Sequence, residues 1–158
     1  MIYVTLGADT YTKSKFISKL RSANAPPDLV DANTTLIQGH DLSITQLMEI
    51  CNVVPFLAER RLVIVEGFID SMNPSSRNRR SSKFKPGGSP NLIDDVIRSL
   101  DSMVPTTDLI LNEGNSRITD QLVKSLTSLA TIKEFDPPSG PALTKWIHEY
   151  ATSIGGEI

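Results

Sequence analysis

The residues that could bind a phosphate lie near the N-terminus. The stretch Gly7-Ala8-Asp9-Thr10-Tyr11-Thr12-Lys13-Ser14 matches the pattern G-x-x-x-x-G-K-[ST] at three of its four fixed positions. In that pattern backbone N–H groups surround the phosphates, the lysine reaches them and the hydroxyl holds Mg²⁺. Thr12 replaces the second glycine and puts a β-carbon where the backbone must approach the phosphates. We expect either a degenerate nucleotide loop carried by Gly7, Thr12, Lys13 and Ser14, or an ordinary strand-to-helix turn.

A P-loop ATPase also needs a carboxylate after a neighbouring strand, to hold Mg²⁺ and position water. Glu66 is the single candidate, where such enzymes usually have an Asp-Glu pair, and no arginine finger is evident. The sequence therefore predicts a nucleotide-binding type of fold that has lost its ATPase residues, with no catalytic residue, no metal site and no cofactor. Lys13 keeps weak binding of ATP and Mg²⁺ open as an alternative.

Two bulky apolar residues, Phe56 and Leu57, follow Pro55, which should end the preceding helix. One interpretation is that both pack beneath a sheet, as their composition favours. The other is that they point outwards and fill an apolar pocket of a partner protein, because adjacent bulky side chains commonly anchor interfaces. Both interpretations stay open at this point.

Residues 71–90 are rich in Ser, Pro and Gly and carry five cations with no acidic residue, so a flexible basic loop is expected. These cations suggest one candidate function, the binding of DNA phosphates. Runs of charged residues in such loops are, however, usually just exposed to solvent. The net charge of the whole chain is −2, so its other residues hold eleven cations against eighteen acidic residues. The cations are Arg77, Arg79, Arg80, Lys83 and Lys85.

The elements that must position these residues alternate between short apolar runs and helical patterns, which is typical of a parallel α/β sheet. Helices are expected after the capping-box residues Ser43 and Gln46, from Ser89-Pro90 to Pro105, and around Leu122 and Trp146. Five strands are expected, at 2–6, 29–31, 62–65, 109–111 and 132–135, and the third is expected to be a central strand covered on both faces.

The composition restricts the class of protein further. The 158 residues are 39% hydrophobic, which is enough for one core, and the single Cys51 excludes an internal disulfide. No signal peptide and no run of about 20 apolar residues is present. We therefore expect a cytoplasmic protein that neither spans nor binds a membrane.

The stretch Pro55-Phe56-Leu57-Ala58-Glu59-Arg60-Arg61-Leu62-Val63-Ile64-Val65-Glu66 resembles the signature Pro-Leu-Phe-Ser-Glu-Arg-Arg-Leu-Val-Val-Val-Glu of the delta subunit of the bacterial DNA polymerase III clamp loader. The start of the chain, residues 2–9, is similar to that family's first strand and degenerate loop. Residues 107–111 and 143–147 occupy the expected later places. The resemblance is sharp over 53–67 and covers most of the chain.

The resemblance implies a RecA-like AAA+ three-layer sandwich over 1–136, with the basic loop at 71–90. It also implies a linker and the first helix of a helical lid domain over 137–158, the rest of that domain being absent. Members of the family act in DNA replication as non-catalytic subunits of a polymerase holoenzyme, a nucleotidyltransferase. They bind the sliding clamp, the ring-shaped beta subunit, and hold it open while other subunits hydrolyse ATP.

The implied partners are thus the sliding clamp, the other subunits of a hetero-pentameric clamp loader, and DNA as part of the assembly. Carried over to this sequence, the clamp-binding pair falls on Phe56 and Leu57, in reversed order relative to the family. Two other function classes remain as alternatives, a P-loop nucleotide-binding ATPase and a module that contacts DNA through residues 77–85.

Overall fold

Five parallel strands form a single sheet in the order β2-β3-β4-β1-β5. The computed structural model describes residues 1–72, 92–114 and 120–156. The strands are β1 (Ile2–Leu6), β2 (Thr34–Gln38), β3 (Arg61–Glu66), β4 (Thr107–Asn112) and β5 (Ala130–Glu134). The helices are α1 (Thr10–Asn24), α2 (Ile44–Cys51), α3 (Phe68–Met72), α4 (Leu92–Asp101), α5 (Gln121–Leu126) and α6 (Pro141–Ser153), with a 3-10 turn η1 at Gly39–Asp41. The predicted α/β fold with a five-stranded parallel sheet is confirmed.

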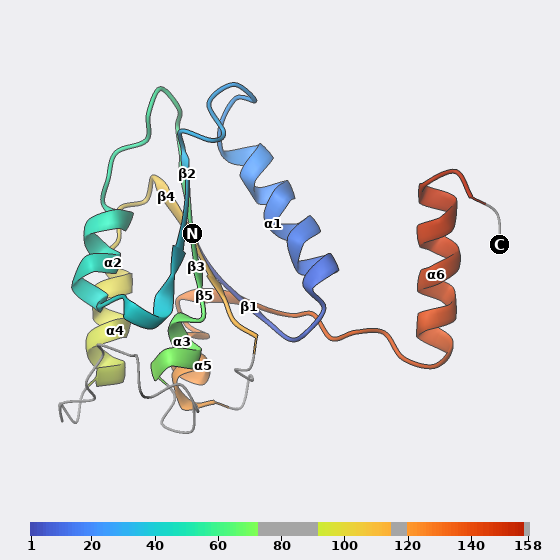
Figure 1. Ribbon diagram of the computed structural model, residues 1–158. Helices are drawn as coiled ribbons and strands as arrows, with labels where there is room; N and C mark the ends of the chain where they lie inside the picture. The colour runs from blue at the N-terminus through green and yellow to red at the C-terminus, as the bar shows by residue number, and fades with distance from the viewer. Residues whose placement is uncertain (73–91, 115–119, 157–158) are drawn as a thin grey trace.

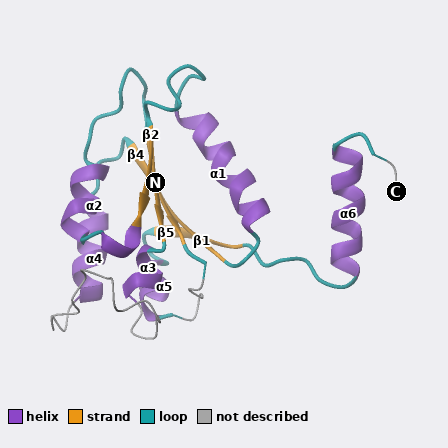
Figure 2. Cartoon of the chain, in the orientation of Figure 1, coloured by secondary structure: helices purple, strands orange, loops and turns teal. Residues whose placement is uncertain are grey.

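Helices cover both faces of the sheet, which makes three layers (Figures 1 and 2). Alternate residues of the central strands point to opposite faces, as the pleat requires. On one face Leu62, Ile64 and Ile110 pack with Ile17 and Leu20 of α1. Because β3 is buried on both faces, its run of apolar residues shows no polar alternation.

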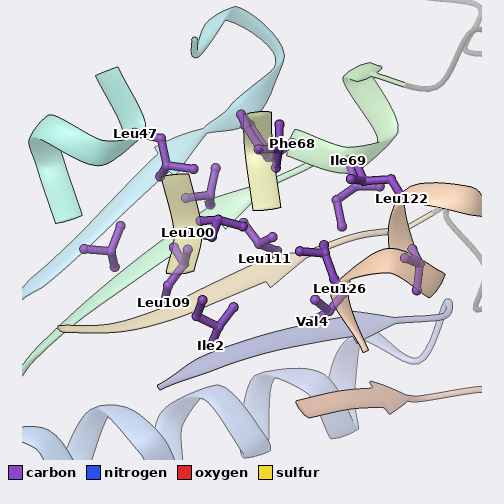
Figure 3. Packing of buried hydrophobic residues seen from close by; sticks show 14 of the residues in the cluster. Ile2, Val4, Leu47, Phe68, Ile69, Leu100, Leu109, Leu111, Leu122 and Leu126 are labelled. Atoms are coloured by element: carbon purple, nitrogen blue, oxygen red, sulfur yellow. The ribbon is translucent and has the colours of Figure 1, made fainter. Parts of the chain in front are cut away.

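The larger part of the core lies on the opposite face, between the sheet and α2, α3, α4 and α5. Val63, Leu109 and Leu111 point into it from the two central strands. Figure 3 shows the side chains from the helices that meet them, with Leu47 of α2 and Phe68 of α3 among those labelled. Both are fully buried, so this face supplies most of the apolar burial that stabilises the domain.

The second strand is not where the sequence predicted it. Residues 29–31 lie in a run of turns, in which the Leu29 amide donates to the Pro26 carbonyl at 2.8 Å and the Asn33 amide to the Leu29 carbonyl at 3.1 Å. The strand is β2, five residues later, and it pairs with β3. The prediction was wrong because β2 is an edge strand with Leu36 62% exposed, so it lacks the apolar run of a buried strand.

Other boundaries differ by smaller amounts. The short helix α3 was not predicted, and its last two residues, 71 and 72, fall within the segment expected to be a loop. Phe135 lies beyond the end of β5, where its carbonyl accepts the Asp9 amide. The capping box at Ser43 and Gln46 is confirmed, with both reciprocal hydrogen bonds present.

Helix α6 stands beside α1 and away from the sheet (Figure 1). Its contact with α1 is aromatic: the Tyr11 ring meets Trp146 and Tyr150 edge to face, at centroid distances of 5.7 and 5.4 Å. The ammonium of Lys15 lies 4.6 Å from the Tyr11 ring centroid, within cation–π range. The helix is confirmed, whereas the assignment of 137–158 to a separate lid domain stays a prediction.

Candidate functional site

An exposed apolar turn, residues 53–57, connects α2 to β3. Phe56 and Leu57 are 58% and 76% exposed, and Val53 and Val54 are 51% and 80% exposed. Isolated exposed apolar side chains are common, but four within five residues form a patch of the kind that marks an interaction site. The structure therefore excludes the interpretation that Phe56 and Leu57 pack beneath the sheet. Sequence reasoning missed Val53 and Val54, although both are plain in the sequence.

The backbone of the apolar turn is fixed by polar contacts. Leu57 has a φ of +49°, in the left-handed region that a branched side chain rarely adopts. The Phe56 amide donates to Oδ1 of Asn33 at 2.7 Å, and Nδ2 of Asn33 donates to the Phe56 carbonyl at 2.8 Å. Asn33 itself is only 2% exposed. The exposed side chains therefore stand on a backbone that is held from below.

Two arginines join the turn to the sheet. Nε of Arg60 donates to Oδ2 of Asp108 at 3.0 Å, and the N-terminal ammonium of Met1 donates to Oδ1 at 2.8 Å. Burial raises the pKa of Asp108, but the hydrogen bonds from Arg60 and the N-terminus outweigh it and hold that pKa below its usual range. Arg61, 8% exposed, donates to Oγ1 of Thr35 at 2.7 Å and to the Val53 carbonyl at 3.4 Å.

The second predicted site, the loop between β1 and α1, lies at the other end of the sheet. Because all five strands are parallel, the turn that enters β3 is at their amino ends and the loop that leaves β1 is at their carboxyl ends (Figure 1). Gly7 has a φ of +94°, and a β-carbon there would lie 2.4 Å from the Phe135 carbonyl oxygen. The glycine is thus required by the close approach of residue 135.

The N-terminus of α1 is occupied by a carboxylate of the chain itself. Asp9 is the N-cap residue, and its Oδ1 accepts the Thr12 amide at 3.0 Å. Its Oδ2 accepts the Thr12 hydroxyl at 2.6 Å, and these two bonds hold the pKa of Asp9 below its usual range. A phosphate bound at a helix N-terminus would use these donors. Thr12, the substitution for glycine, therefore serves the cap.

Lys13 points into the protein. It is 5% exposed and its Nζ donates to the Glu113 carbonyl at 2.8 Å, while the neighbouring Ser14 is exposed. Burial lowers the pKa of Lys13 although the nearby carboxylates of Glu113, Asp70, Asp9 and Glu66 oppose this. The carboxylate of Glu66 accepts from Nε2 of Gln38 at 2.6 Å. The structure thus brings Lys13 and Glu66 together at the carboxyl ends of the strands, where the lysine ammonium is hydrogen-bonded to a backbone carbonyl.

Glu113 is a buried carboxylate that the sequence reasoning did not single out. It has no exposed surface, and its two oxygens accept the amides of Ile69 and Asp70 at 3.0 and 2.9 Å. Burial raises the pKa of Glu113 to about 7 although these amides favour the ionised form. The carboxylate accepts hydrogen bonds from backbone amides in the first turn of α3, which have no acceptor within the helix. No motif marks such a residue; it stands one position beyond β4.

The cations proposed for DNA contact, Arg77, Arg79, Arg80, Lys83 and Lys85, lie outside the described residues. Over the ranges 1–72, 92–114 and 120–156, no group of three or more His, Cys, Asp or Glu side chains is placed to hold a metal ion. Within the same ranges, no helix has the length and apolar character needed to cross a bilayer.

The structure is thus a five-stranded parallel α/β sheet with an exposed apolar turn at its amino ends and, at its carboxyl ends, a loop engaged by the chain's own contacts. The model of the family "DNA polymerase III, delta subunit" matches residues 3–136. The chain therefore belongs to the DNA polymerase III delta subunit family, a family of DNA replication proteins. No curated protein sequence matches it significantly.

Two of the solved structures that this chain resembles in fold come from Bacillus subtilis and Thermotoga maritima. The Bacillus subtilis DNA clamp loader delta protein (YqeN) is 21% identical with a TM-score of 0.68, and the match covers 97% of this chain and 43% of that one. A DNA polymerase III gamma subunit-related protein from Thermotoga maritima is 14% identical with a TM-score of 0.51, over 94% of this chain and 45% of that one. The chain thus spans less than half the length of either protein.

Proposed function

We propose that this chain is the clamp-binding module of a clamp-loader delta subunit, and that its apolar turn inserts Phe56 and Leu57 into an apolar pocket of the sliding clamp. The observation that carries the proposal is the exposure of both side chains, 58% and 76%, on a backbone held by hydrogen bonds. Residues that carry a function are commonly presented in this way, on a loop positioned by a rigid scaffold.

The proposed mechanism is non-catalytic. A ligand that prefers the open ring shifts the population of rings towards opening, and the energy comes from binding alone. Burial of two large apolar side chains contributes about 3 to 6 kcal/mol before the cost of association is subtracted. That energy is enough to matter for ring opening and too small for tight binding alone. The remaining affinity comes from contacts around the pair, for which Val53 and Val54 are the nearest candidates.

We propose no role for nucleotide in this module. The Nζ of Lys13 donates to a backbone carbonyl, and the Asp9 carboxylate holds donors that a phosphate would need. These contacts support a delta subunit that relies on other subunits of a hetero-pentamer for ATP hydrolysis. In the same proposal residues 137–158 are the linker and first helix of a lid domain. DNA is a partner of the assembly, and residues 77–85 are kept as the candidate contact.

The experiment compares binding of the whole chain to the purified sliding clamp of the same organism. Phe56→Ala combined with Leu57→Ala is expected to weaken binding at least about 100-fold, because most of the burial energy of the pair is lost. Leu143→Ala with Ile147→Ala is the matched control, since those two apolar side chains are 41% and 40% exposed on α6. The control should bind like the wild type.

Circular dichroism establishes that both double variants are folded. Wild-type affinity in the folded Phe56 and Leu57 variant would exclude the apolar turn as the binding site. Ring opening is then followed by energy transfer between labels across one clamp interface. The wild-type chain should raise the open fraction and the double variant should not.

A further inference from the structure

We infer that Asn33 is a positioning residue for the apolar turn: its side-chain amide holds the backbone of Phe56 on both sides, so that Phe56 and Leu57 stand outwards before any partner binds. The positioning concerns this chain alone. Its consequence for binding rests on the proposed function, and the experiments below separate the two.

The side-chain amide of Asn33 bonds to both backbone groups of Phe56, as a neighbouring strand would do. Oδ1 of Asn33 accepts the Phe56 amide at 2.7 Å, and Nδ2 donates to the Phe56 carbonyl at 2.8 Å. Both groups of a planar amide therefore bond both polar groups of one residue, across 23 positions of sequence. The pair fixes the orientation of the peptide planes on either side of Phe56, which a single hydrogen bond does not do.

Asn33 is itself firmly anchored. It is 2% exposed, and its Nδ2 also donates to the Leu29 carbonyl at 3.0 Å. Its backbone amide bonds to the same carbonyl at 3.1 Å, and its own carbonyl accepts the Leu62 amide at 2.8 Å. The turn of residues 26–33 is thereby joined to the first part of β3. The residue that holds Phe56 is consequently anchored both to the turn before β2 and to the start of β3.

Only asparagine supplies this set of contacts at this position. The side chain must accept once and donate twice at the reach of one methylene, and an aspartate has no donor. At the other end of the turn, Arg61 donates to the Val53 carbonyl at 3.4 Å. Two side chains thus hold the backbone of the apolar turn, and of these Asn33 makes the shorter contacts and bonds to Phe56 itself.

The physical consequence is preorganisation. Leu57 has a φ of +49°, which an unrestrained leucine leaves for the right-handed or extended regions. Without Asn33 the turn would sample those conformations, and binding would have to restore the ordered one. Ordering costs of this kind reduce affinity even when every contact in the complex is unchanged.

The first test measures hydrogen exchange of the Phe56 amide in the free chain. Asn33→Ala should speed this exchange at least about tenfold, because the acceptor of that N–H is removed. The amides in the middle of β3 should keep their protection, which separates local release from unfolding. Where Asn33→Ala does not fold, Asn33→Leu replaces it, since it also removes the acceptor of the Phe56 amide and keeps a side chain of similar size. Unchanged exchange at Phe56 would overturn the inference.

The second test measures affinity for the purified sliding clamp. Asn33→Ala or Asn33→Asp should weaken binding about tenfold, and the loss should shrink when Leu57→Ala is already present. A general loss of stability would give the same fold-change in both backgrounds. The control is Asn112→Asp, at the other end of the sheet, where Oδ1 accepts the Thr5 hydroxyl at 2.9 Å and an aspartate keeps that acceptor.

The results of the two tests are distinguishable. Faster exchange at Phe56 with unchanged clamp affinity would overturn the role of Asn33 in binding. Wild-type affinity of the Phe56→Ala plus Leu57→Ala variant would overturn the proposed function, and the exchange measurement would still decide whether Asn33 holds the turn. Faster exchange, a tenfold loss of affinity and a silent Asn112 control together support the inference.

Discussion

The two ends of this sheet differ in which side chains they bury and which they expose. At the carboxyl ends, the loop between β1 and α1 has the outline of a phosphate site, yet its glycine, its helix N-terminus and its lysine are all engaged by the chain itself. At the amino ends, the apolar turn of residues 53–57 directs polar contacts inwards and exposes its apolar side chains. The polar groups of the first, closed end are bonded within the chain, whereas the second, open end exposes an apolar patch to solvent.

The two ends differ in what they leave exposed to solvent. In open α/β sheets ligands ordinarily bind in the crevice at the carboxyl ends of the strands. Here the contacts of Asp9 and Lys13 close that position, and the exposed patch lies at the opposite end. The fold alone points to the carboxyl ends, whereas the proposed site lies at the amino ends, so the proposal is argued from the site and not from the fold.

The largest expected effect tests the closed end. Gly7→Ala should destabilise the domain by about 4 kcal/mol, because the new β-carbon meets the Phe135 carbonyl and the backbone is left-handed. The free energy of unfolding from urea titration measures the loss. Gly67→Ala isolates the backbone contribution, since Gly67 has a φ of +70° with open space around it, and should cost about 1 kcal/mol. Equal losses at the two glycines would show that the loop is not packed against residue 135.

The next effect concerns the buried carboxylate behind Lys13. The pKa of Glu113 is raised to about 7 in the folded chain from an ordinary value of 4.5, so the folded state binds more protons between these values. The stabilisation is therefore complete below pH 4.5 and is lost as the pH rises through 7. We expect a loss of about 3 kcal/mol relative to Glu113→Gln, because each pKa unit corresponds to about 1.4 kcal/mol.

Urea titrations of the wild type and of Glu113→Gln from pH 4 to pH 8 measure this difference. Asp9 and Asp108, whose pKa values are lowered from 3.8, lose their stabilising effect only at the acidic end of this range, and their contribution cancels in the difference because both chains carry them. A difference in stability that stays constant with pH would contradict a buried, protonatable Glu113.

The smallest effect sharpens the comparison at the open end. Leu57→Gly should raise the free energy of unfolding by about 0.5 kcal/mol, because glycine adopts positive φ without strain and the lost side chain is exposed. The same change should weaken binding to the sliding clamp, since half of the proposed anchor is removed. Thermal unfolding and the clamp-binding assay report the two quantities. A stabilised variant with full affinity would show that the strain at Leu57 does not serve binding.

Much of the fold was predictable because it depends on local apolar patterns. The run of residues 62–65 predicted a central strand, and it is buried on both faces. The capping box at Ser43 predicted the start of α2. The edge strand β2 was misplaced because none of its five residues is buried and two are exposed, so burial leaves little trace in its composition. Helix α3 is five residues long and carries no periodic pattern.

The site was predictable only in part. The pair Phe56 and Leu57 was found, but its exposure was undecided, because the direction of a side chain in a turn depends on the backbone held by Asn33. Lys13 was found as a motif residue, whereas its burial against the Glu113 carbonyl depends on a contact 100 positions away. Long-range polar contacts of this kind follow from the assembled fold.

The central claim is that the open end binds the sliding clamp and the closed end does not take part. Hydroxyl-radical footprinting of the wild-type chain, with and without the purified clamp, tests it directly because it reports the solvent accessibility of individual side chains. Phe56, 58% exposed in the free chain, should lose most of its reactivity on binding, while Tyr11, 36% exposed at the start of α1, should keep its own. Protection of Tyr11 with unchanged reactivity at Phe56 and Leu57 would contradict the account.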